Sequence, residues 1–145
     1  MSVGLLDVNV LLALAQTFHP FHLAATRWFR ENASKGCASC AITESSFIRI
    51  AARAPDGRLP VPEGLRLMER LSRTPGYEFW ALDVPLHALS AELIAGVRGH
   101  QQLTDAILLD LAIRRRGRLV TFDKRVRNLL PEDSPHQAAI EVIEG

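Results

Sequence analysis

Four carboxylates stand where an apolar segment ends or where a helix is expected to begin, and they are Asp7, Glu44, Asp105 and Asp123. Three of them lie directly beside apolar residues, in Val-Gly-Leu-Leu-Asp7, Leu-Thr-Asp105-Ala-Ile-Leu-Leu and Leu-Val-Thr-Phe-Asp123. Because burial of an unpaired carboxylate is costly, a bound cation is the natural compensation. The pattern therefore indicates a metal site.

The expected metal ligands are all oxygen atoms. Carboxylates brought close together repel one another, and some of them take up protons unless a cation is bound. Oxygen ligands without His or Cys favour Mg²⁺, with Mn²⁺ as the alternative. Mg²⁺ keeps several waters and leaves positions open for a phosphate, which suits hydrolysis of a phosphodiester by a metal-activated water.

Taken one at a time, the acids also allow a simpler interpretation as helix caps or surface charges. Glu44 would favour the dipole of its helix, and Asp105 could cap a helix together with Thr104. Asp110 is a useful comparison, because it lies five residues past Asp105. That spacing is about 140° around a helix, so Asp110 should face away from Asp105. Taken together, the four acids favour the metal site.

The elements that must position these acids alternate between strands and helices. Strands are expected at residues 3–6, 37–42, 77–82, 118–122 and 138–143. Helices are expected at residues 9–15, 23–32, 43–53, 63–73, 85–97, 104–116 and 124–130. This order predicts an α/β fold whose central sheet is mostly parallel and covered on both faces. Asp7 and Asp123 then follow the first and fourth strands, at the edge where such sheets bind ligands.

The composition predicts one soluble domain, residues 1–145, in which 48% of the residues are hydrophobic and 23% are charged. Seventeen Lys and Arg against sixteen Asp and Glu give a net charge of +1, which excludes a wholly basic surface but allows a local basic patch. The sequence has no recognisable signal peptide and no apolar run of the ~18 residues that span a bilayer. We therefore expect a cytoplasmic protein that does not enter a membrane.

Cys37 and Cys40 form a single Cys-x-x-Cys pair. Structural zinc would need two further ligands, and although His19 and His22 are present, their spacing matches no familiar zinc motif. A redox pair would open a helix, whereas this pair lies in an expected strand. Buried core cysteines are therefore the preferred interpretation.

The four acids lie in segments that resemble the motifs of a known nuclease family. Leu-Leu-Asp7-Val-Asn9-Val-Leu-Leu-Ala, Ile-Thr-Glu44, Leu-Thr-Asp105-Ala and Leu-Val-Thr-Phe-Asp123 resemble, in order, spacing and apolar flanks, the four motifs of PIN-domain ribonucleases. The resemblance covers nearly the whole chain. His19-Pro-Phe-His22 and the segment from Gly117 to Asp123 are similar to the VapC-type toxins of type II toxin–antitoxin pairs.

This resemblance implies a PIN-like three-layer α/β/α sandwich and a Mg²⁺-dependent endoribonuclease. It implies that Asp7 and Asp105 are the firmest metal ligands, supported by Glu44 and Asp123. Asn9 and Thr121 would orient these carboxylates or a bound water through their amide and hydroxyl groups. It also implies a homodimer, an RNA substrate and inhibition by a small cognate antitoxin. Many relatives carry another acid just after the fourth motif, where this chain has Lys124 and Arg125, which leaves the number of metal ions open.

A basic stretch surrounds the expected fourth strand and could bind RNA phosphates. Its members are Arg114, Arg115, Arg116, Arg118, Lys124, Arg125 and Arg127. The alternative is that a helix end collects cations because its dipole favours them, or that these side chains cover apolar surface.

Other classes of protein also use clustered acids. A phosphoacceptor receiver domain would carry a lysine on a late strand, whereas Lys124 follows the expected strand. A phosphatase with an Asp-x-Asp pair would need an acid where Asn9 stands, and an amide cannot act as the acid or base. A non-catalytic, RNA-binding relative of the PIN ribonucleases is the third alternative.

Overall fold

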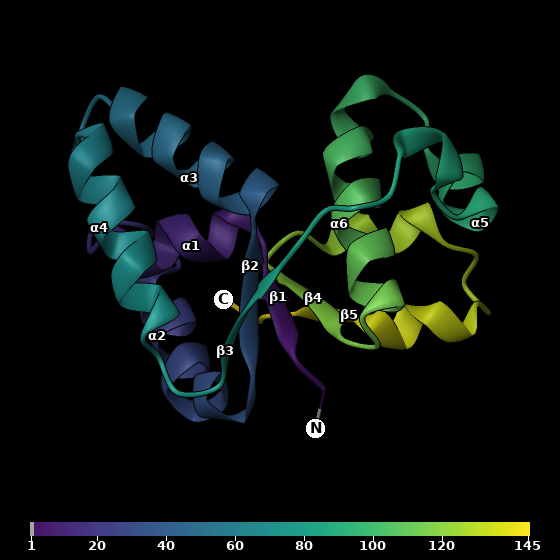
Figure 1. The fold of residues 1–145 in the computed structure, drawn as a ribbon, viewed down its shortest axis with the longest axis horizontal. Helices are drawn as coiled ribbons and strands as arrows, with labels where there is room; N and C mark the ends of the chain where they lie inside the picture. The colour runs from purple at the N-terminus through teal and green to yellow at the C-terminus, as the bar shows by residue number, and fades with distance from the viewer. Residues whose placement is uncertain (1) are drawn as a thin grey trace.

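The computed structural model describes residues 2–145, and its centre is a five-stranded sheet (Figure 1). All strand pairs are parallel, in the order β3-β2-β1-β4-β5. The strands are β1 (Gly4–Leu6), β2 (Cys37–Cys40), β3 (Tyr77–Trp80), β4 (Arg118–Thr121) and β5 (Ile140–Val142). The predicted parallel α/β sheet is confirmed.

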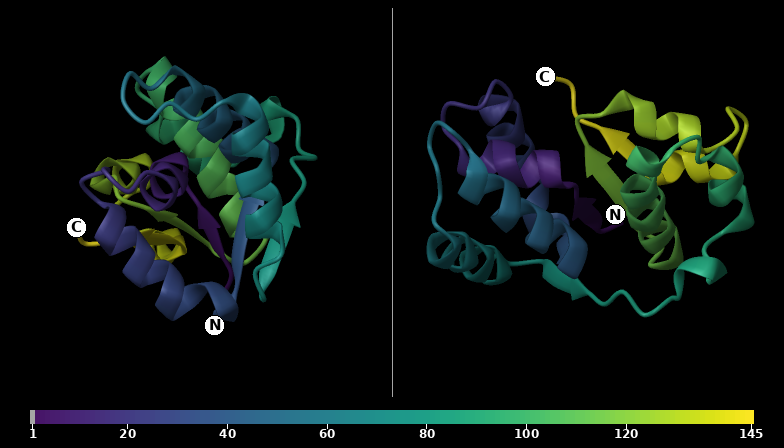
Figure 2. Two further views of the ribbon diagram at one scale, coloured as in Figure 1. Left: turned by 90° about the vertical axis from the view of Figure 1, so that its left-hand side faces the viewer. Right: turned by 90° about the horizontal axis from the view of Figure 1, so that it is seen from above.

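Helices cover both faces of this sheet, as Figures 1 and 2 show. One face carries α1 (Val8–Ala15), α2 (His22–Asn32), α3 (Ala41–Arg53) and α4 (Val61–Ser72). The other carries α5 (Ala91–Gly96), α6 (Leu103–Arg114) and two 3₁₀ helices, η4 (Lys124–Leu129) and η5 (Pro135–Ala139). The molecule is therefore the expected three-layer α/β/α sandwich.

The alternation of side chains along β1 explains why both faces are covered. Leu5 and Leu6 are both fully buried, but Leu5 packs in the core cluster of α6, whereas Leu6 packs in that of α1 and α3. Successive residues of a strand point to opposite faces, so an all-apolar central strand needs an apolar layer on each side. The sheet is thus fixed from both sides next to the end of β1, where Asp7 follows.

All strands run in the same direction, but the side on which successive strands are added to the sheet changes at β1. Strands β2 and β3 lie on one side of β1, and β4 and β5 lie on the other. In open parallel sheets, a change of this kind leaves a crevice beyond the carboxyl ends of the strands. Asp7 and Asp123, which follow β1 and β4, lie at this crevice.

Residues 85–97 do not form the single helix that was predicted. They form a 3₁₀ helix, η2 (Leu86–Ala88), an extended Leu89 and the short helix α5. The backbone N–H of Ser90 donates to Oδ1 of Asp110 at 3.0 Å, a contact with α6 that no local sequence pattern indicates. Residues 124–129 are likewise 3₁₀ instead of α-helical, and Asp123 caps them by accepting from the N–H of Arg125 at 2.9 Å.

The remaining expectations concern the cysteines and the membrane. Cys37 and Cys40 are free thiols buried in β2, and burial raises the pKa of Cys37 to about 11. A thiol of that pKa is protonated at neutral pH and a poor nucleophile. Among residues 2–145, no helix combines the length and the apolar character needed to cross a membrane.

Candidate active site

Asp7, Asp105 and Asp123 come together at the carboxyl edge of the sheet. Asp7 follows β1 and caps α1, Asp105 lies in the first turn of α6, and Asp123 follows β4 and caps η4. Their charges act on one another: Asp123 raises the pKa of Asp7, and both of these residues raise that of Asp105. The structure thus brings three of the four predicted acids within electrostatic reach of each other.

Asp7 is the most enclosed of the three, with 7% of its surface exposed. Its Oδ1 accepts from the N–H of Val8 at 2.7 Å, and its Oδ2 accepts from the hydroxyl of Thr121 at 2.7 Å. Burial raises the pKa of Asp7, although both hydrogen bonds work in the opposite direction. The carboxyl is therefore held firmly in one orientation and is costly to ionise while no cation is near.

Thr121 and Asn9 form the support behind Asp7. The Thr121 hydroxyl, which donates to Asp7, accepts from Asn9 Nδ2 at 3.0 Å and from the backbone N–H of Asp123 at 3.1 Å. Asn9 Oδ1 in turn accepts from the N–H of Phe122 at 3.2 Å. These bonds fasten the turn after β1 to the end of β4, so that the position of Asp123 is fixed relative to Asp7.

Asp105 faces the same edge from α6 and is half-buried. Burial is the main cause that raises its pKa to about 6, followed by the charges of Asp7 and Asp123, while Arg125 acts in the opposite direction. A carboxyl in these surroundings readily exchanges its proton for a metal ion, because a cation removes the repulsion.

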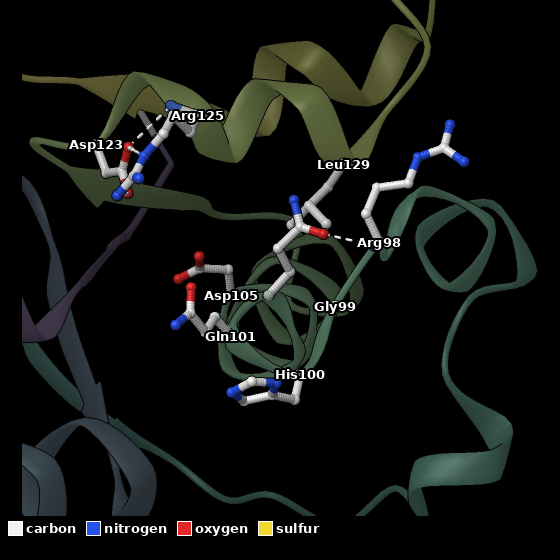
Figure 3. A pocket seen from close by; sticks show the side chains of 9 residues that line it. Arg98, Gly99, His100, Gln101, Asp105, Asp123, Arg125 and Leu129 are labelled. Atoms are coloured by element: carbon white, nitrogen blue, oxygen red, sulfur yellow. Dashed lines mark hydrogen bonds and ion pairs between the residues drawn. The ribbon is translucent and has the colours of Figure 1, made fainter.

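Asp123 differs from the other two aspartates because it already forms an ion pair with an arginine side chain. Its Oδ1 accepts from Nε of Arg125 at 3.0 Å and its Oδ2 from a terminal guanidinium nitrogen of Arg125 at 2.9 Å (Figure 3). These hydrogen bonds are the main cause that lowers the pKa of Asp123. Asp123 is therefore ionised and neutralised by its own near neighbour in the chain.

Glu44 is held by a separate set of hydrogen bonds. It lies in the first turn of α3, and its Oε2 accepts from the hydroxyls of Ser39 and, at 3.4 Å, Tyr77. The Ser39 and Tyr77 hydroxyls are 2.6 Å apart. These partners come from β2 and β3, so Glu44 is tied to that side of the sheet and makes no hydrogen bond with the three aspartates.

Sequence reasoning missed Ser39 and Tyr77. The available signal was that Ser39 is the one hydroxyl in the otherwise apolar strand Cys37–Cys40, five residues before Glu44. Tyr77 could not have been found in this way, because it belongs to another strand and its pairing with β2 depends on the register of the sheet.

A cavity of about 490 Å³ opens beside Asp105 and Asp123. Its other wall is the connection between α5 and α6, from Arg98 to Gln102, together with Leu129. Figure 3 shows the Asp105 carboxylate and the side chains of His100 and Gln101 on one side of the cavity, with Asp123 and Arg125 across from them. Arg98 is exposed and was not identified from the sequence, because it stands alone, outside the basic stretch.

The predicted basic stretch divides into two groups, one at the C-terminal end of α6 and the start of β4, and the other beside the cavity. Arg114 pairs with Asp110 at 2.5 Å, and Arg118 pairs with Glu141 at 2.5 Å. The Arg115 guanidinium lies 6.0 Å from the ring centre of Trp80, and Arg116 adopts a positive φ of 55° in the turn before β4. These four residues lie at the far end of α6 or at the start of β4, whereas Lys124 and Arg125 lie beside the site.

The donor atoms at this edge fit a magnesium ion. Among residues 2–145, no three His, Cys, Asp or Glu side chains form a complete ligand cage. Mg²⁺ does not need one, because it keeps several waters and is bound through one or two carboxylates. Asp7 and Asp105 could supply that pair from oxygen atoms alone. A divalent ion would also neutralise the charges of Asp7 and Asp123, which add to burial in raising the pKa of Asp105.

Proteins of known family match this chain over most of its length. The PIN domain profile matches residues 4–129. The chain is 38% identical to Ribonuclease VapC39 of Mycobacterium tuberculosis over 142 residues. The aligned region covers 97% of this chain and 99% of that protein. It is 40% identical over 129 residues to Ribonuclease VapC38 of the same species, covering 88% and 89%. The chain therefore belongs to the PIN-domain family, among the VapC ribonucleases.

A solved structure supports the same architecture. The crystal structure of VapBC2 from Rickettsia felis, bound to a DNA fragment from its promoter, shares the fold with a TM-score of 0.62 at 14% identity. The match covers 98% of this chain and 99% of that chain. Membership of the PIN family sets aside the receiver-domain and phosphatase alternatives.

Proposed function

We propose that this protein is a Mg²⁺-dependent endoribonuclease, able to use Mn²⁺, that acts as the toxin of a toxin–antitoxin pair. The observation that carries the proposal is the pair Asp7 and Asp105. Burial is the main cause that raises the pKa of both carboxyls; the charge of Asp123 adds to it at Asp7, and the charges of Asp7 and Asp123 add to it at Asp105. Among the side chains around them, Arg125 opposes the repulsion on Asp105, but it donates its hydrogen bonds to Asp123. A divalent ion is the partner that this pair lacks.

We assign different roles in the site to different residues of the chain. Asp7 and Asp105 would hold the ion, with Thr121 and Asn9 keeping Asp7 in place through the hydrogen bonds between the ends of β1 and β4. Asp123 would add a third carboxylate, and Glu44 a supporting acid whose orientation Ser39 and Tyr77 set. The bound ion supplies a polarised water and neutralises charge on the phosphodiester that is cleaved.

RNA would lie along the cavity beside Asp105. Arg98, Lys124 and Arg125 are exposed cations on or beside its walls, and they are the phosphate contacts that we propose. Arg114, Arg115, Arg116 and Arg118 would contribute little, because α6 separates its two ends by about 15 Å over the ten residues after Asp105. Their contacts within the chain favour a role in stability.

The remaining parts of the proposal concern partners and location. The relatives named VapC and the VapBC2 assembly support a small cognate antitoxin as the inhibitor. We also propose that the protein works as a homodimer in the cytoplasm, where its RNA substrate is found.

Substitution of the most buried acid tests the catalytic proposal. Asp7→Asn keeps the size and one acceptor of the side chain but removes its charge, so it should reduce RNA cleavage at least about a hundredfold. Asp83→Asn, an exposed residue away from the cavity, is the control and should cleave like the wild type. Cleavage of a mixed RNA substrate is measured with Mg²⁺ and again with EDTA.

Three outcomes would contradict this proposal. Full activity of Asp7→Asn would exclude the assigned site, and cleavage that persists in EDTA would exclude a dependence on metal. RNA binding without cleavage by the Mg²⁺-loaded wild type would identify a non-catalytic RNA-binding relative.

A further inference from the structure

The guanidinium of Arg125 donates to both oxygens of Asp123, one of the carboxylates proposed above as metal ligands. We propose that Arg125 is a built-in competitor of metal ions at Asp123, which leaves Asp7 and Asp105 as the first pair to be loaded. The inference rests on the metal-dependent function proposed above and adds an order of loading to it.

The geometry of the pair shows that both oxygens of Asp123 already accept hydrogen bonds from Arg125. Its Oδ1 accepts from both the backbone N–H and Nε of Arg125, at 2.9 and 3.0 Å, and its Oδ2 accepts from the guanidinium at 2.9 Å. This is the forked pairing that guanidinium groups make with carboxylates. An ion that bound both oxygens of Asp123 would have to displace part of this pairing, and an ion at the remaining position of Oδ2 would meet the repulsion of the guanidinium charge.

The pair is also placed so that displacement is easy. A single residue, Lys124, separates the partners in the chain, and the side chain of Arg125 is 84% exposed whereas that of Asp123 is 25% exposed. Exposed ion pairs are screened by water and contribute little to stability. Arg125 should therefore raise the metal concentration needed at Asp123 instead of preventing binding altogether.

Arg125 also acts on Asp105. Its charge lowers the pKa of Asp105, against the effects of Asp7 and Asp123. It lines the cavity together with Asp105 and Asp123, as Figure 3 shows. Three acids and one guanidinium thus share this edge, and the guanidinium already offsets one of their charges.

Titration of the RNA-free protein with Mn²⁺, followed by calorimetry and by electron paramagnetic resonance, tests the competition. Arg125→Gln should bind Mn²⁺ about twofold to fivefold more tightly, the range expected for loss of an exposed ion pair. Arg127→Gln is the matched control, because it removes the same charge from an exposed position on the same 3₁₀ helix. Its affinity should change less than that of Arg125→Gln.

The same substitution in an Asp123→Asn protein distinguishes competition for Asp123 from a general effect of charge on Mn²⁺ binding. In Asp123→Asn protein, the added substitution Arg125→Gln should no longer tighten Mn²⁺ binding, because the contested carboxylate is gone. Equal effects of Arg125→Gln and Arg127→Gln, or an effect that persists with Asn at position 123, would overturn the inference. Absence of Mn²⁺ binding to every protein, wild type included, would instead overturn the metal-dependent function and this inference with it.

Discussion

Asp105 shows how strongly the surroundings of one residue alter its chemistry. Burial, followed by the charges of Asp7 and Asp123, raises its pKa from 3.8 to about 6. The unfolded chain releases this proton near the ordinary pKa, so between 3.8 and about 6 the folded protein binds more protons than the unfolded one. Stability must then fall as the pH rises through that window.

The free energy of unfolding of the metal-free protein should accordingly be larger near pH 5 than near pH 7.5. Asp105 should account for about 1 kcal/mol of the difference, after solvent screening of a partly exposed carboxyl is allowed for. Urea denaturation in EDTA at both pH values measures it, and Asp105→Asn provides the reference without the titrating group. The same pH dependence in both proteins would show that Asp105 does not carry the effect.

Among the elements, α5 depends on a residue of another helix. Asp110 of α6 is 4% exposed, and it accepts from the N–H of Ser90 at 3.0 Å and from Nε of Arg114 at 2.5 Å. The Ser90 contact fixes the start of α5, and α5 leads into the connection that forms one wall of the cavity. Asp110 thus contributes to the shape of the site although it faces away from Asp105.

Asp110→Ala should lower the free energy of unfolding by about 2 kcal/mol, because it leaves a backbone N–H and a guanidinium without their partner. Amide hydrogen exchange at Ser90 should become faster in the same variant. Asp83→Ala, which is exposed, should change stability by less than about 0.5 kcal/mol. Unchanged exchange at Ser90 in Asp110→Ala would mean that other contacts hold α5.

The same contact shows where sequence reasoning could and could not succeed. The strands and the acids that follow β1 and β4 were predictable, because apolar runs ended by a charge are local patterns. The break at Leu89 and the hydrogen bonds of Glu44 were not, since their causes, Asp110, Ser39 and Tyr77, come from other elements. The basic stretch appeared uniform in the sequence, but folding places Arg114 at the C-terminal end of α6 and Arg125 at the cavity beside Asp105.

For the whole molecule, metal binding and stability should be linked. An ion that binds only the folded protein stabilises it by about 2.7 kcal/mol at a hundred times its Kd. For a chain of this size, that corresponds to a rise in Tm of roughly 5–10 °C. Thermal denaturation with Mg²⁺, compared with NaCl of equal ionic strength, should show this rise in the wild type. Asp105→Asn should lose most of it, and an equal rise in both proteins would place the ion elsewhere.

The central position of β1 has a consequence for the synthesis of the protein. Asp7 is among the first residues made, but the Thr121 hydroxyl that fixes it lies 114 positions later. Strand β1 pairs with β4 along its whole length, so the middle of the sheet stays open until residues 118–121 have been added. Contacts so distant in sequence form late. A ribosome that makes this protein therefore carries, through most of translation, a nascent chain in which the edge that carries the proposed site has not yet been assembled.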